Sequence, residues 1–84
     1  MPTPNQRGRF RRRALALLAA SSDGATEAIM LAHGFALDLL VEMVRDGLAT
    51  AHVERMVAGK RKIEVVRVRI TDVGRRALAE RRKT

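Results

Sequence analysis

The feature that most constrains the fold is a pair of alternating apolar and polar runs in the second half of the chain. Residues 51–57 (AHVERMV) and 63–71 (IEVVRVRIT) flank the short segment AGKR. A period of two is typical of β-strands, and two such runs joined through a glycine are typical of a β-hairpin. With the turn centred on the Gly-Lys pair of that segment, Arg55 lies opposite Glu64. The inward-facing side chains are then Val66, Val68 and Ile70, while Arg67 and Arg69 face water.

The first half of the chain has helical periodicity instead. Apolar residues recur at helical spacing from Phe10 onward, and Thr, Gly and Asp stand where helices begin and end. We predict helices from Phe10 to the segment SSDG, over 27–32 with Thr26 as N-cap, over about 36–46 with a stop at Gly47, and after Thr71. The expected order is helix, helix, helix, strand, strand, helix.

The third of these helices sits where a helix-turn-helix protein carries its DNA-reading helix, yet it is acidic. At 100° per residue, Leu37, Leu40, Val41 and Val44 fall on one arc and are expected to face the core. The other side carries Ala36, Asp38, Leu39, Glu42, Met43 and Asp46. Two interpretations are open: the N-terminal segment or the last helix covers Leu39 and Met43, or these side chains contact a protein partner, including a second copy of the chain.

Charge is distributed unevenly along the chain. Residues 1–13 carry five Arg and no acid, residues 14–52 carry one Arg against five acids, and residues 53–84 carry eleven bases against four acids, for a net charge of +8. Clustered Lys and Arg at both ends favour a polyanion partner. The alternative is a solubilising surface with a disordered basic tail.

Composition excludes several classes of function. The absence of Cys excludes disulfides and thiolate zinc sites, and the absence of Trp and Tyr excludes a stacking platform for single strands. Ser21, Ser22 and Asp23 suit capping, and His33 and His52 suit a turn and an exposed strand, so we expect no catalytic residue, no metal and no cofactor. The basic start followed by a short apolar run also imitates a secretory signal, but its spacing suits an amphipathic helix, and we expect a cytoplasmic protein without a membrane span.

The run from DGLA through a basic hairpin turn into VRVRITDVGRRAL resembles winged-helix regulators of the MarR type over residues 10–80. Ile70, Thr71 and Gly74 match the exit of the wing, Gly47 and Leu48 match the end of the reading helix, and Lys60 to Lys62 match the wing tip. The chain departs from the family in lacking long terminal helices and in beginning its third helix with FALD rather than polar residues. The resemblance implies an α+β, mainly α, winged helix-turn-helix domain over 10–80, between a flexible basic arm (1–9) and a basic tail (81–84).

The resulting functional prediction is duplex DNA binding through backbone contacts from arm and wing, by a transcriptional regulator or accessory factor. Major-groove reading by the acidic third helix is not expected, because Arg45 is its only base. The expected DNA contacts are Arg7, Arg9, Arg11, Arg12, Arg13, Lys60, Arg61, Lys62, Arg67 and Arg69. The alternative is a protein-interaction module that docks or dimerises through Ala36, Asp38, Leu39, Glu42 and Met43.

Overall fold

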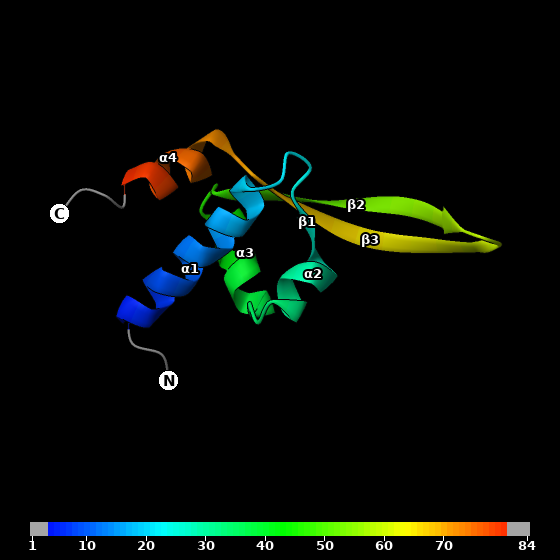
Figure 1. Ribbon diagram of the computed structural model, residues 1–84, viewed down its shortest axis with the longest axis horizontal. Helices are drawn as coiled ribbons and strands as arrows, with labels where there is room; N and C mark the ends of the chain where they lie inside the picture. The colour runs from blue at the N-terminus through cyan, green and yellow to red at the C-terminus, as the bar shows by residue number, and fades with distance from the viewer. Residues whose placement is uncertain (1–3, 81–84) are drawn as a thin grey trace.

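The computed structural model describes residues 4–80, with side chains described from Gly8 onward. Within this part the chain is an α+β structure of four helices and a three-stranded antiparallel sheet (Figure 1). The elements are α1 (Pro4–Ala19), β1 (Ala25–Thr26), α2 (Glu27–Ala32), α3 (Leu37–Arg45), β2 (Ala49–Ala58), β3 (Arg61–Ile70) and α4 (Asp72–Glu80). The sheet order is β1-β3-β2. All four helices gather at one end, and the β2–β3 hairpin projects away from them (Figure 1).

The predicted helix boundaries are confirmed where a local hydrogen bond or glycine sets them. The Thr26 hydroxyl accepts the Ile29 amide at 3.2 Å, which satisfies one of the free amides at the start of α2. The Thr71 hydroxyl accepts the Gly74 amide at 3.0 Å and donates to the Gly47 carbonyl at 2.6 Å. Thr71 therefore caps α4 and ties it to the end of α3.

The hairpin is confirmed with the predicted register. β2 pairs with β3 from Ala49 opposite Ile70 to Ala58 opposite Arg61, and Gly59 opens the turn at a φ of 65°. Arg55 lies opposite Glu64, with their charged groups 3.5 Å apart.

Strand β1 was not predicted, because two residues cannot display an alternating pattern. It pairs with β3 through Ala25 opposite Val68 and Thr26 opposite Arg67. Gly24 brings it there with a φ of 75°, and a Cβ at this position would collide with the Val68 carbonyl oxygen. Only glycine allows the backbone to approach β3 so closely and pair alongside it.

The predicted flexible arm over 1–9 is wrong for residues 4–9, which form the start of α1. Proline is well tolerated in the first turn of a helix, since its fixed φ suits the helix and the amide it lacks would be unpaired. Residues 1–3 and the predicted basic tail 81–84 lie outside the described residues.

The core forms where α1, α2 and α3 meet the base of the sheet. Its buried members are Ala14, Leu15, Leu18, Ala25, Met30, Phe35, Leu39, Leu40, Met43, Leu48, Ala49 and Val68. No polar or charged residue is buried among the described side chains.

The predicted core face of the third helix is correct for Leu40, which is 4% exposed, and wrong for its other three residues. Met43 is fully buried and Leu39 is 9% exposed, whereas Leu37, Val41 and Val44 are 50%, 47% and 38% exposed. Six of the nine residues of α3 are apolar, so an arc of about 200° could have faced the core. Leu39 and Met43 are therefore core residues, which agrees with the interpretation that another part of the chain covers them and contradicts a partner contact through an exposed edge of these two side chains.

Candidate functional site

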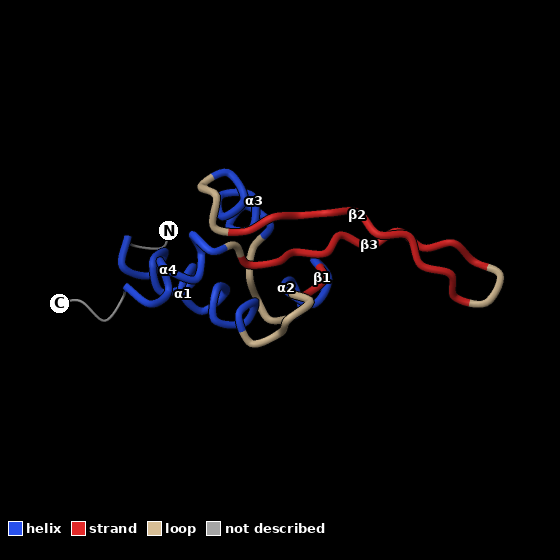
Figure 2. The backbone as a smooth tube through the Cα atoms, turned by 90° about the horizontal axis from the view of Figure 1, so that it is seen from above, coloured by secondary structure: helices blue, strands red, loops and turns tan. Residues whose placement is uncertain are grey.

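The tip of the hairpin is a concentrated basic site. Lys60, Arg61 and Lys62 are consecutive and exposed, and none of them has an ion-pair partner among the described residues. The turn holds them at the far end of the hairpin, away from every helix (Figure 2). The acid nearest in sequence, Glu64, pairs with Arg55. The tip therefore presents three charges that no acid of the described chain neutralises.

The two arginines behind the tip are engaged within the protein. The Arg67 Nε donates to Glu54 Oε1 at 2.8 Å across the two strands. This hydrogen bond and the charge of Arg67 hold the pKa of the Glu54 carboxyl below its usual value, and the same contact raises the pKa of Arg67. Arg69 donates to the Asp23 carbonyl at 3.3 Å and lies 3.8 Å from Glu54. Arg67, predicted to face water, is only 21% exposed in its side chain.

The bases of α1 divide into two groups. Arg9, Arg12 and Arg13 are exposed and have no ion-pair partner among the described residues. Arg11 instead crosses to α3, where its guanidinium lies 3.3 Å from Glu42 and 2.9 Å from Asp46. The side chain of Arg7 lies outside the described residues. Figure 1 places α1 and the hairpin tip toward opposite ends of the molecule, so the predicted DNA contacts do not form one patch.

The Arg11 contacts explain why α3 is acidic. Glu42 and Asp46 stand on the side of α3 that faces α1, beside the buried Leu39 and Met43. One guanidinium bridging two carboxylates orients the two helices, although each group is partly exposed and the stabilisation is about 1 kcal/mol or less. Two of the three acids at this helix, Glu42 within it and Asp46 at its C-cap, therefore contact α1, and Asp38 has no ion-pair partner among the described residues.

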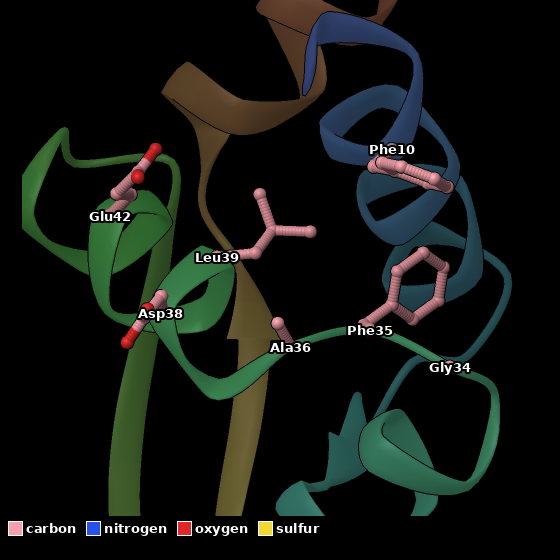
Figure 3. Close-up of a pocket in the computed structure, with 7 residues that line it drawn as sticks. All are labelled: Phe10, Gly34, Phe35, Ala36, Asp38, Leu39 and Glu42. Atoms are coloured by element: carbon pink, nitrogen blue, oxygen red, sulfur yellow. The ribbon is translucent and has the colours of Figure 1, made fainter. Parts of the chain in front are cut away.

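The predicted protein-contact residues line a crevice between α1 and α3. Its volume is about 340 Å³, and its walls are Phe10, Gly34, Phe35, Ala36, Asp38, Leu39 and Glu42. Figure 3 shows Leu39 directed toward the rings of Phe10 and Phe35, while Asp38 points away from them. The residues predicted as a docking surface are thus mostly the wall of an internal contact with α1, and Met43 is buried behind it.

A second hollow, of about 320 Å³, lies on the other side of α3 and is almost entirely apolar. It is lined by Glu27, Leu37, Leu40, Val41, Val44, Arg45, Ala51, Val66 and Val68. The exposed residues Leu37, Val41 and Val44 form its wall on the helix, and β2 and β3 form its floor. Sequence reasoning missed this groove because it assigned those three residues to the core. The signal that could have found it is the surplus of apolar residues around α3.

No family model matches the chain, and neither a curated protein nor a solved structure matches it significantly. Residues 4–80 contain no group of three His, Asp or Glu side chains placed to hold a metal ion. None of the helices in this range is long and apolar enough to cross a membrane.

Proposed function

We propose that this chain is a winged-helix domain that binds duplex DNA through its phosphate backbone, with the hairpin as the wing. The order α1-β1-α2-α3-β2-β3, with an antiparallel sheet in the order β1-β3-β2, supports this arrangement. The resemblance of the segments around Gly47 and Gly74 to winged-helix regulators supports it independently.

The observation that carries the proposal is the unpaired basic tip. Lys60, Arg61 and Lys62 project at the end of two ten-residue strands, beyond the reach of the acids of the helical end (Figure 2). Clustered cations that displace the counterions of a duplex supply most of the affinity of binding that is independent of sequence. A narrow two-stranded projection fits a groove of the duplex, as wings and β-ribbons do.

The exposed face of α3 argues against reading of bases. It presents Leu37, Val41 and Val44, flanked by Asp38 and Arg45. Base edges in the major groove are read mainly by paired donors from Arg, Lys, Asn or Gln, and this face carries only one such residue. The proposed activity is therefore backbone binding with little base selectivity, which suits an accessory factor better than an operator-specific regulator.

Arg9, Arg12 and Arg13 of α1 form the proposed second contact. They are exposed and have no ion-pair partner within the described chain, and the helix that carries them lies toward the end of the molecule opposite the tip (Figure 1). The longest dimension of the molecule is 52 Å, which corresponds to about 15 base pairs of duplex.

The test is fluorescence anisotropy with random-sequence duplexes over a series of salt concentrations. The double variant Lys60→Ala/Lys62→Ala should weaken binding to all sequences alike, and the slope of log K against log salt should fall by about 2. The matched control is Arg75→Ala/Arg76→Ala on α4, which removes the same charge far from the tip and should change the slope less. Absence of binding at low salt, or an equal loss in the control, contradicts the proposal.

A further inference from the structure

The apolar groove beside α3 continues onto exposed apolar side chains of the hairpin. Because side chains alternate along a strand, Ala51, Val53, Arg55 and Val57 of β2 share one face with their partners on β3, Val68, Val66, Glu64 and Lys62, and the Arg55–Glu64 ion pair interrupts the apolar side chains of this face. Val53 is 63% exposed and Val57 is 75% exposed. A two-stranded ribbon is only marginally stable alone in water, so an apolar face along it is suited to being covered.

This face carries opposite charges at its two ends. At the groove end, Glu27 and Arg45 line the wall, and Asp38 stands next to Val41 on the surface of α3, so two acids outweigh one base there. Neither carboxylate has an ion-pair partner among the described residues. At the tip end stand the bases Lys60 and Lys62. A surface that is acidic at one end and basic at the other is complementary to a reversed copy of itself.

The position of α3 determines how a second hairpin can lie on this face. Leu37, Val41 and Val44 stand over the floor formed by Ala51 and Val66, so a second copy in the same direction would bring its own α3 into collision. A reversed copy brings only its slender tip to the groove. This arrangement is an isologous pair about a two-fold axis perpendicular to the strands.

The same symmetry decides which charges of the groove and the tip meet, while Arg55 and Glu64 in the middle of the face neutralise each other within each copy. A two-fold axis perpendicular to the strands lays β3 of one copy over β3 of the other. Lys62, on β3, then falls on the side of the groove where β1 leads into Glu27, away from Arg45, which precedes β2.

We propose that this face is a self-complementary interface between two copies of the chain. The hairpin tip of each copy, with Val57 and Lys62, occupies the apolar groove of the other against Leu37, Val41 and Val44. This contact is distinct from DNA binding but uses the same residues of the tip. A duplex and a second copy of the chain therefore cannot occupy the tip at the same time. The pairing itself does not depend on the DNA proposal, since it is tested without DNA.

Charge reversal in sedimentation equilibrium tests the interface. The wild type should dimerise, and either Glu27→Lys/Asp38→Lys or Lys60→Glu/Lys62→Glu should weaken dimerisation by ~10-fold or more, since like charges then meet at both ends. An equimolar mixture of the two variants should form a mixed dimer. In it the reversed groove of one variant meets the reversed tip of the other, and the two unreversed parts meet as in the wild type, so opposite charges face each other in both contacts. The quadruple variant should also dimerise with itself. The matched control is Arg75→Glu/Arg76→Glu, which should dimerise as the wild type does.

Circular dichroism verifies that each variant is folded, and Val57→Ser gives a second measure that leaves the acids and bases in place. Val57→Ser should also weaken the dimer. A monomeric wild type, a dimer that both reversals leave intact, or a mixture that fails to recover overturns the proposal. A dimer that behaves as expected but does not dissociate when duplex is added overturns the competition alone.

Discussion

The helical end of the molecule and its projecting hairpin are held together in different ways. The helical end buries apolar side chains from α1, α2 and α3 against the base of the sheet. Between Thr50 and Arg67, in contrast, no side chain is buried. The hairpin is held by its backbone ladder and by the cross-strand pairs Arg55–Glu64 and Arg67–Glu54.

This difference separates stability from binding within one small chain. Burial of apolar surface is the main source of folding free energy, so substitutions at the helical end should act on stability. The hairpin leaves its apolar and basic side chains exposed, so substitutions there should act on partners. The two sides of α3 carry the same division, with Met43 buried and Val44 exposed.

The largest expected effect distinguishes those two sides of α3. Met43→Ala should lower the free energy of unfolding by about 2–5 kcal/mol, because it leaves a cavity in the core. Val44→Ala should cost much less, since its side chain is 38% exposed. Urea unfolding measured at a concentration where the chain is monomeric compares them. Equal losses would show that α3 turns a different face to the core.

A smaller effect should separate two glycines of similar φ angle. Gly24 and Gly59 have φ values of 75° and 65°, but a Cβ at Gly24 meets the Val68 carbonyl, whereas one at Gly59 meets nothing within 4 Å. Ala at either position costs about 1–2 kcal/mol for its left-handed backbone. Gly24→Ala should cost a further ~1–3 kcal/mol from the collision. Thermal unfolding of both variants measures the difference, and a larger loss for Gly59→Ala would contradict it.

The smallest effect concerns the pH dependence of the hairpin. The hydrogen bond from Arg67 holds the pKa of Glu54 below its usual value near 4.5, so the folded state binds this proton less readily than the unfolded chain. The stabilisation from this hydrogen bond is present when the pH is above the usual pKa of Glu54, and it is lost as the pH falls through the lowered pKa of the folded state. Glu54→Gln should therefore be less stable than the wild type at neutral pH and converge with it at acidic pH.

Denaturant unfolding at several pH values checks this dependence, and Arg67→Gln is its reciprocal variant. Removing the donor should return Glu54 toward ordinary titration and flatten the same part of the curve. A wild-type acid dependence in Arg67→Gln would show that another group is responsible.

The parts of the fold that depend on neighbouring residues were predictable. Thr26, Gly47 and Thr71 set helix boundaries through bonds and dihedral angles within a few positions, and all three were predicted correctly. The register of the hairpin followed from its turn, because a two-residue connection leaves one alignment of the strands. The basic tip, the central part of the candidate site, was located in the same way.

The parts that depend on distant contacts were not predictable. Gly24 and β1 depend on the position of β3, more than forty residues later. The ion pairs of Arg11 and Arg67 remove both from the set of free bases, and neither partner is evident from spacing alone. The apolar groove likewise appears only when the orientation of α3 is known.

By itself, the sequence determined the order of the helices, the hairpin and the charge at its tip, because caps, turns and alternation are local. Only the tertiary structure decided which side of α3 is buried. Because six residues around that helix are apolar, several orientations of the helix would bury a similar apolar area. In the orientation that the helix adopts, Arg11 contacts Glu42 and Asp46. That choice buries Leu39 and Met43 and leaves Leu37, Val41 and Val44 as the wall of a binding groove.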